Sequence, residues 1–414
     1  MKTVILLALC LCGLLSCPGF ALAFDDGHPE VTVLVQNAAA ICVGRVTHIE
    51  DLGPTQVDLG YTVGGTNLPA PAAARSMIAE VAVQSVLKGK ISPKTITVAF
   101  YKNVHLASKP SSPAPFTELA VGETDILFLK TTDSAVSFTL SQPSSYGKSK
   151  ITIGDAKIGP ILVTAPPLRA VLLVLVDALG SGSKPVKVEC LDRIGSTGYL
   201  LYAKAGVWVD KGAVNRRTAL GESLLADNPS SSLEAFIRAK IFPAVLKLTT
   251  DKDADVRDQA VLAAGRLQDV DVIPALAKLA NRQSQPGFVG VGMAADIFSQ
   301  YRNPDATRAL VGVLGDTNPN VRSQAAESLR ESADPVAVPF LLEHLDDPDH
   351  DARYYIVTAL YTATDTPEYP GTVLFHDDED KYVTFWKKWA ADHQDKVAAL
   401  REQFLAPLPT KAVH

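Results

Sequence analysis

Residues 346–351 are the densest group of side chains in this sequence that could do chemistry. Their order, Asp-Asp-Pro-Asp-His-Asp, brings carboxylates and an imidazole into one turn, and such ligands could bind a divalent cation. The turn lacks the glycine and the distal glutamate of a calcium-binding loop. Asp347 also recurs in a sequence repeat, so we expect a solvated turn whose acids cap the next helix. Cation binding stays open as the alternative.

A second acidic run, residues 376–380, opens with a histidine, and the helix dipole favours acids at a helix start. The usual catalytic signatures are missing from the sequence. It has no His-Glu-x-x-His, no Gly-x-Ser-x-Gly, no phosphate loop ending in Lys-Ser or Lys-Thr, and no Cys-x-x-Cys. We therefore expect no catalytic, cofactor-binding or metal-binding residues, and a protein that is not an enzyme.

The elements that carry these turns repeat along the C-terminal half. Pro243, Pro274, Arg308 and Pro339 open equivalent apolar segments, and their residue numbers differ by 31, 34 and 31. A second register agrees with the first, because an arginine follows a turn aspartate by six residues in three repeats. We expect this spacing to place a carboxylate and a guanidinium in line from repeat to repeat, as a structural ladder of charge-assisted hydrogen bonds: Asp251, Arg257, Asp316, Arg322, Asp347 and Arg353.

Each repeat has the pattern of a helical hairpin, with a proline in the first turn, an apolar helix, a polar turn and a second helix such as residues 256–267. Neither helix can bury its apolar stripe alone, but stacked neighbours can, so the pattern predicts a solenoid. The second repeat departs from the pattern at residues 283–290, where the turn is replaced and lengthened. This departure is either a local recognition feature or sequence drift.

The motif Leu-x-Asp-x-Asn/Asp-x-x-Val-Arg-x-x-Ala, with its Pro-x-Leu-x-x-Leu opening, resembles the HEAT-repeat family and its phycobilin-lyase-like subset. The resemblance is specific over residues 243–364 and weaker over residues 167–242, where Val186 and Lys187 take the place of the Val-Arg step. It implies an α-α superhelix with an extended surface for recognition.

A helix that begins near Asp377 carries aromatic residues at a spacing that places them on one face. An open end of a solenoid needs an element that covers its apolar surface. We therefore expect these residues to be a capping stripe: Tyr382, Phe385, Trp386 and Trp389.

The N-terminal half has a different period. Apolar residues alternate with polar ones in six runs between residues 41 and 153, which predicts half-buried strands in a small antiparallel barrel or sandwich. Residues 32–39 are expected to form a short helix. Two stretches, residues 51–76 and 108–116, are rich in glycine or proline and are expected to be long irregular loops.

Three short sequence segments of this half, which begin at Cys42, Val86 and Val121, resemble netrin-like, tissue-inhibitor-type barrels of the OB class. In the inhibitors of that family an N-terminal cysteine of the mature chain chelates the zinc of the target protease. The mature chain here would begin at Phe24, so the resemblance does not extend to that function.

The first 23 residues have the pattern of a signal peptide, with Lys2, an apolar stretch and a small-x-small cleavage site before Phe24. We expect export to the periplasm or the exterior, with a lipoprotein anchored through Cys17 as the alternative. Cys42 and Cys190 are expected to be buried thiols that form no bridge. The net charge is -6, with 39 basic and 45 acidic residues, and gives no reason to expect a nucleic-acid partner.

The sequence thus predicts a multidomain α+β chain, a β barrel or sandwich followed by a HEAT-type solenoid. Its expected function is a scaffold that binds a protein or peptide partner without catalysis. One alternative is a lyase-like or chaperone activity with Asp347 or His350 as acid or base. Another is inhibitor-like binding by the β domain. The expected segments are a signal peptide (1–23), a β-rich domain (24–153), a linker (154–166), degenerate repeats (167–242), HEAT repeats (243–376) and capping helices (377–405).

Overall fold

A computed structural model of the chain describes residues 31–58, 61–63, 66–68, 71–103, 116–132, 137–141, 149–159, 165–198, 233–283, 293–298, 301, 306–367 and 370–406. The expected signal peptide and Cys17 lie outside these ranges. Among the described helices, none has the length and apolar character that crossing a membrane requires.

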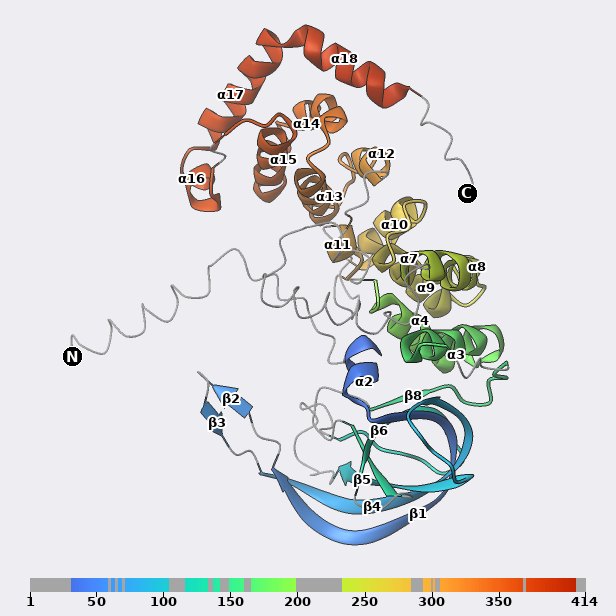
Figure 1. Ribbon diagram of the computed structural model, residues 1–414. Helices are drawn as coiled ribbons and strands as arrows, with labels where there is room; N and C mark the ends of the chain where they lie inside the picture. The colour runs from blue at the N-terminus through green and yellow to red at the C-terminus, as the bar shows by residue number, and fades with distance from the viewer. Residues whose placement is uncertain are drawn as a thin grey trace, which may run out of the picture.

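A β region precedes a helical array, as expected (Figure 1). The main sheet has the order β1-β4-β5-β7-β6-β8, and a further pairing of β6 with β1 rolls it up. Only three residue pairs join β5 to β7, in parallel, so the roll is not cleanly closed. The strands are β1 (Ala40–Asp58), β4 (Pro71–Lys88), β5 (Thr95–Asn103), β6 (Thr124–Thr131), β7 (Ser137–Leu140) and β8 (Lys150–Thr152).

The expectation of an irregular loop over residues 51–76 is wrong. There β1 and β4 continue as an antiparallel arm, paired from Gly53 opposite Ser76 to Asp58 opposite Pro71, with a short hairpin of β2 (Tyr61–Val63) and β3 (Thr66–Leu68) beyond it. Ala74 is buried in the arm, but no described residue of the arm belongs to either apolar core, so the segment shows little apolar alternation. Gly53 has a φ of 105°, which suits the register shift at that point. The other expected loop lies almost wholly outside the described residues.

Strand β6 is buried on both faces, so the expectation of half-buried strands fails there, whereas β5 shows the expected alternation. Ile41 and Phe128 pack in the same core as α2 (Val31–Asn37) and the helical array, whereas alternate residues such as Leu127 fill a second core inside the roll. The predicted short helix is confirmed as α2. The two described cysteines, Cys42 and Cys190, are free and lie in different cores, and burial raises the pKa of Cys42 to about 12.

The helices of the array lie in two rows (Figure 1). The first row contains α3 (Pro167–Ser181), α8 (Phe242–Leu248), α10 (Ile273–Gln283), α12 (Thr307–Val311) and α14 (Val338–Glu343). The second-helix row contains α4 (Lys184–Gly195), α9 (Ala254–Arg266), α11 (Met293–Phe298), α13 (Pro319–Ser332) and α15 (His350–Ala363), with each member in contact with the next. Shorter pieces join the first row: α7 (Leu233–Phe236), the π-helical turn η2 (Ile237–Ile241) and the 3₁₀ turn η4 (Pro335–Ala337).

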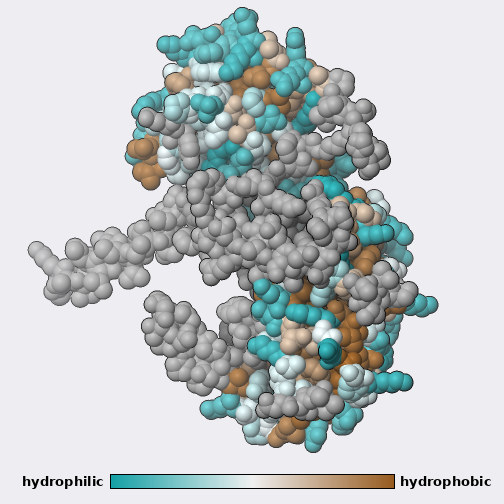
Figure 2. Space-filling model, viewed as in Figure 1, coloured by the Kyte–Doolittle hydropathy of each residue, from teal (hydrophilic) through white to brown (hydrophobic). Residues whose placement is uncertain are grey.

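Three helices follow the last repeat: α16 (Thr372–Asp377), α17 (Glu379–Asp392) and α18 (Gln394–Leu405). The end of α18 returns to the first row, where the Phe404 ring lies 4.2 Å from that of Phe340 and Arg401 pairs with Glu343 at 2.5 Å. A hydrophobic patch is visible at the position of α16 (Figure 2), where Val373 and Leu374 are exposed.

The β region and the array share one apolar core, which runs from α2 through β1, β6 and β8 into α3, α4 and the later repeats. Of the predicted linker, residues 154–159, 165 and 166 are described, and the amide of Gly159 donates to Asp177 Oδ2 of α3 at 2.8 Å. This part of the linker is attached to the first helix of the array.

Candidate functional site

The turns between paired helices are built from two polar side chains with different tasks. In one turn, Asp316 Oδ1 accepts from the amide of Asn318 at 2.9 Å, and Asn318 in turn accepts from the amide of Asn320 as the cap of α13. In the next, Asp347 accepts from Asp349 at 2.8 Å and Asp349 caps α15 through the amide of Ala352. The first aspartate thus shapes the turn, and the second polar residue begins the helix.

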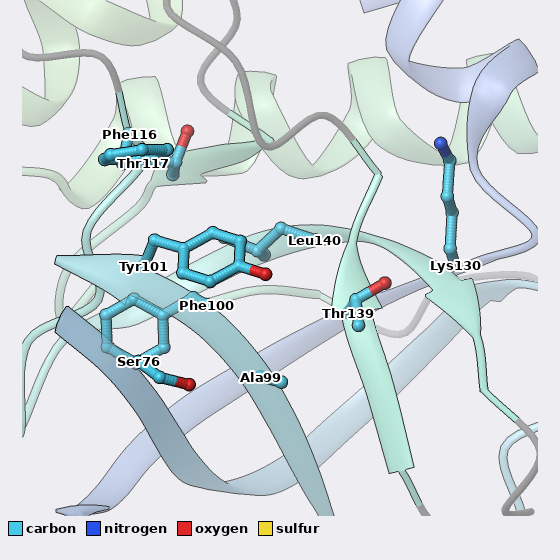
Figure 3. A pocket seen from close by; sticks show the side chains of 9 residues that line it. All are labelled: Ser76, Ala99, Phe100, Tyr101, Phe116, Thr117, Lys130, Thr139 and Leu140. Atoms are coloured by element: carbon cyan, nitrogen blue, oxygen red, sulfur yellow. The ribbon is translucent and has the colours of Figure 1, made fainter. Parts of the chain in front are cut away.

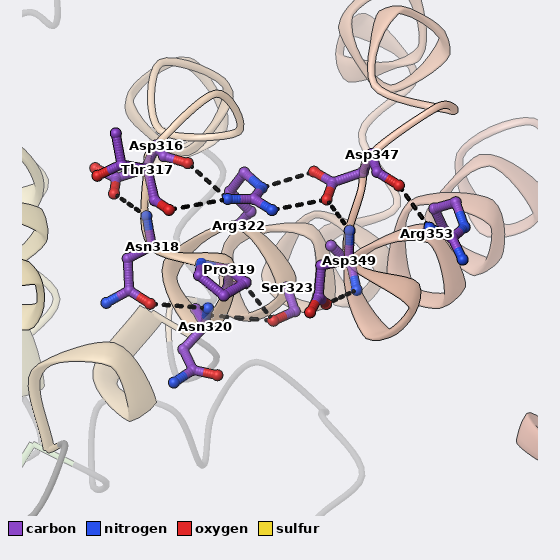
Figure 4. Close-up of polar contacts among 11 residues, drawn as sticks. Asp316, Thr317, Asn318, Pro319, Asn320, Arg322, Ser323, Asp347, Asp349 and Arg353 are labelled. Carbon is purple, nitrogen blue, oxygen red and sulfur yellow. Dashed lines mark hydrogen bonds and ion pairs between the residues drawn. The ribbon is translucent and has the colours of Figure 1, made fainter. Parts of the chain in front are cut away.

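Arg322 joins two of these turns (Figure 4). Its Nη1 donates to the carbonyl oxygen of Asp316 at 2.8 Å in its own repeat. Its Nε and Nη2 donate to the two carboxylate oxygens of Asp347 in the next repeat, at 2.7 and 2.8 Å. Both side chains are buried, and the hydrogen bonds to Asp347 raise the pKa of Arg322 above its ordinary value in spite of burial.

The pairing therefore runs between repeats, whereas within a repeat the arginine binds the backbone carbonyl of its aspartate. Arg353 follows the same rule: Nη1 donates to the carbonyl of Asp347 at 2.6 Å, and Nε donates to Glu379 Oε2 at 2.9 Å. Glu379, the first residue of α17, takes the place of a turn aspartate there. The sequence period did not identify it, because α17 lies beyond the last repeat.

The ladder is interrupted in its middle. Arg257 Nη1 donates to the carbonyl of Asp251 at 2.9 Å, and no carboxylate pairs with Arg257 among the described residues. The expected cause, the altered turn at residues 283–290, lies almost wholly outside them. Asp316 instead accepts from Asn281 Nδ2 of α10 at 3.0 Å. At the other end, Lys187 Nζ lies 3.7 Å from Asp251 Oδ2, in the role expected of the Val-Lys step.

The capping residues differ in burial. Trp386 is fully buried and meets Tyr361 of α15 edge-on, with ring centroids 5.0 Å apart. Tyr382 and Trp389 are partly buried against the same core. Phe385 is 42% exposed and lies over Tyr361 at 5.9 Å. Only part of the predicted stripe is thus covered by the array.

The acids of residues 346–351 serve separate partners. Asp346 pairs with Lys387 of α17 at 2.6 Å, Asp347 is held by Arg322, and Asp349 caps α15. Both carboxylate oxygens of Asp347 accept hydrogen bonds from Arg322, and this disfavours the alternative in which Asp347 acts as an acid or base. His350 has a different environment, because its Nε2 lies 3.0 Å from Asp351 Oδ1 and its ring stacks on that of another histidine.

A polar group lies across α13 and α15 on the second-helix row, and we call it the Arg330 cluster: Glu327, Arg330, Glu331 and Tyr355. Arg330 Nη2 lies 2.7 Å from Glu331 and 3.5 Å from Glu327, and its guanidinium lies 5.6 Å from the centre of the Tyr355 ring. All four side chains are partly exposed. Burial raises the pKa of Tyr355 to about 12, so the phenol is neutral at physiological pH and can donate a hydrogen bond.

These four residues carry no motif, and the sequence did not single them out. Glu327 and Glu331 are four residues apart, so they lie on one face of α13. This spacing is the only signal in the sequence, and it does not distinguish a recognition surface from an ordinary solvated face.

The β region contains a small cavity against β5 and β7 (Figure 3). Its volume is about 230 Å³, below the 300–1,000 Å³ or so of ordinary small-molecule sites. Its lining mixes aromatic and hydroxyl side chains with one lysine: Ser76, Ala99, Phe100, Tyr101, Phe116, Thr117, Lys130, Thr139 and Leu140.

Asp125 is the buried acid of the β region. It is fully buried on β6, with Lys150 Nζ 3.6 Å from its Oδ2. Burial raises its pKa to about 6, although Lys150 and the hydroxyl of Thr152 favour the ionised form.

Residues 292–360 match the family of HEAT repeats. No curated protein matches the chain. Among solved structures, an engineered protein is 18% identical, over 59% of this chain and 66% of its own, with a TM-score of 0.23. A designed armadillo repeat protein is 15% identical, over 56% of this chain and 97% of its own, with a TM-score of 0.28. Human deoxyhypusine hydroxylase in complex with glycerol is 18% identical, over 49% of this chain and 86% of its own, with a TM-score of 0.17.

Proposed function

We propose that this HEAT-repeat protein is a binding scaffold, and that a protein or peptide partner binds on its second-helix row. The observation that carries the proposal is the Arg330 cluster, which spans two adjacent repeats and presents an arginine and a tyrosine together. Arginine and tyrosine are enriched among the residues that dominate binding energy in protein interfaces.

The cluster is also positioned before any partner arrives. Arg330 is held by two carboxylates and by the ring of Tyr355, and Thr362 donates to its carbonyl oxygen at 3.0 Å. Side chains fixed in this way lose less conformational freedom on binding. Two carboxylates stand beside one guanidinium, so the partner segment is expected to bring a basic side chain.

The experiment is affinity capture from the extracellular or periplasmic fraction, with the chain from Phe24 to His414 as bait and mass spectrometry as the readout. Tyr355→Ala and Glu331→Lys should each weaken retention of the same partner about tenfold or more, since truncating an interface anchor costs about 2 kcal/mol. Lys278→Glu is the control, because Lys278 is exposed on α10 in the other row. Equal retention by all four baits would remove the cluster from the interface.

The proposal includes export of the chain, which rests on the pattern of residues 1–23. N-terminal sequencing of the protein from its native host tests it. A first residue of Phe24 supports signal-peptide cleavage, and an acylated Cys17 at the terminus supports the lipoprotein alternative.

A further inference from the structure

Three helix ends meet beside the last repeat and bring two histidines and a glutamate together. His350 is the first residue of α15, His376 lies in the last turn of α16, and Glu379 is the first residue of α17. One ligand atom from each of the three lies within 4.8 Å of the others. The two imidazole rings stack with centroids 4.3 Å apart.

The spacing of the ligand atoms suits a single tetrahedral ion. Glu379 Oε1 lies 3.4 Å from His376 Nδ1 and 3.7 Å from His350 Nδ1. Ligands about 2.0–2.2 Å from a tetrahedral Zn²⁺ lie about 3.3–3.6 Å from one another. Both measured distances are close to that range. Because an imidazole binds a metal in its own ring plane, one of the two stacked rings must turn out of the stack, and His350 is exposed and can turn.

The outer contacts fix the orientation of these ligands. Arg353 donates to Oε2 of Glu379, which leaves Oε1 directed at the two histidines. His350 Nε2 lies 3.0 Å from Asp351 Oδ1, so a proton on Nε2 is held by a carboxylate and Nδ1 keeps its lone pair. Metal-binding histidines commonly have such a carboxylate behind them, and metal-binding carboxylates are themselves hydrogen-bonded.

We propose that His350 Nδ1, His376 Nδ1 and Glu379 Oε1 bind one divalent transition-metal ion of the Zn²⁺ type. Imidazole with carboxylate selects zinc and its first-row neighbours over Mg²⁺ and Ca²⁺, which take oxygen ligands. His350 is exposed, so the fourth position faces solvent and takes water. The ion links α15 of the last repeat to α16 and α17. It is a clamp on the cap, and it does not depend on the proposed partner.

The sequence places the two histidines in separate acidic runs, 26 residues apart, and each run has an adequate explanation as a helix start. Only the fold of α16 back onto the beginning of α15 brings them together. The sequence therefore favoured a helix start for each run and left cation binding within residues 346–351 as an alternative.

The test is Zn²⁺ binding to the metal-stripped chain, without residues 1–23 and without a histidine tag, by competition with a chromophoric chelator. The wild type should bind one more equivalent than His350→Ala and than His376→Ala. His393→Ala is the matched control, because it removes an exposed imidazole that also stacks on a ring, that of Trp389 at 4.3 Å, at the other end of α17. It should bind like the wild type.

Two further measurements guard against a variant that merely misfolds. Asp351→Asn keeps all three ligands and should weaken Zn²⁺ binding by about 10- to 100-fold. Zn²⁺ should also slow amide hydrogen exchange in α16 and the first turn of α17 of the wild type, and Mg²⁺ should not. The proposal is overturned if the wild type and the two histidine variants bind the same number of ions, or if Zn²⁺ leaves exchange in α16 unchanged.

Discussion

At the scale of single residues, the repeats are joined by arginines that each serve two repeats. Arg322 donates to the carbonyl of Asp316 in its own repeat and to the carboxylate of Asp347 in the next. Arg353 donates in the same way to the carbonyl of Asp347 and the carboxylate of Glu379. A buried ion pair adds little net stability compared with an apolar pair of similar size. Removing one partner is costly, because it leaves the other charge buried and unpaired. The ladder therefore specifies how neighbouring repeats align.

Arg322→Ala should lower the free energy of unfolding by about 3 kcal/mol, because it leaves the buried Asp347 carboxylate without its guanidinium. Arg257→Ala is the control, since Arg257 occupies the same repeat position and its described hydrogen bond is to one carbonyl. It should cost about 1 kcal/mol. Urea unfolding of both variants measures the difference, and equal losses would contradict the inter-repeat role.

Asp125 should make stability depend on pH. The unfolded carboxyl loses its proton near its ordinary pKa of 3.8, and the folded one near 6. Between these values the folded state holds more protons, so the free energy of unfolding falls as pH rises from about 4 to about 6 and is then level. The decrease is about 3 kcal/mol. Urea unfolding from pH 4 to 7 should show it in the wild type and not in Asp125→Asn. Parallel pH profiles for the two proteins would refute it.

The residue contacts were partly predictable from the sequence. The six-residue spacing identified Arg322 and Asp347 as members of a ladder, because both recur with the repeat. It did not give their mutual pairing, which depends on how one repeat stacks on the next. Glu379 and the Arg330 cluster have no period at all, and only the packed helices bring them together.

At the scale of elements, the helices of the array were predictable and the long strands were not. Prolines, capping aspartates and apolar stripes are local signals, and they mark helices such as α9, α13 and α15 directly. The arm of β1 and β4 gives no such signal, because none of its described residues belongs to either apolar core. Its pairing also joins residues up to 23 positions apart, as at Gly53 and Ser76.

The cap depends mainly on one aromatic residue. Trp386→Ala should lower the free energy of unfolding by about 3–5 kcal/mol, because it opens a cavity under α17. Phe385→Ala, at the neighbouring and half-exposed position, should cost less than about 1 kcal/mol. Thermal unfolding of the two variants provides the comparison. A larger loss for Phe385→Ala would mean that the stripe is oriented differently.

At the scale of the whole molecule, the β region and the repeats form one structure because their apolar faces share a core. The sequence suggested two domains with a linker between them, since a change of period marks a boundary and carries no information about contact across it. That common core contains Phe128 of β6 and residues of α3, among them Leu168, Ala170, Val171, Leu172, Val174 and Leu175. Binding experiments therefore require the full chain.

The central claim is that a partner binds on the second-helix row, and amide hydrogen exchange of the captured complex tests it most directly. The account predicts slower exchange in α13 and α15 around Arg330 and Tyr355 on binding, with the first-row helices α10 and α12 unchanged. Protection confined to the β region or to the first row would contradict it.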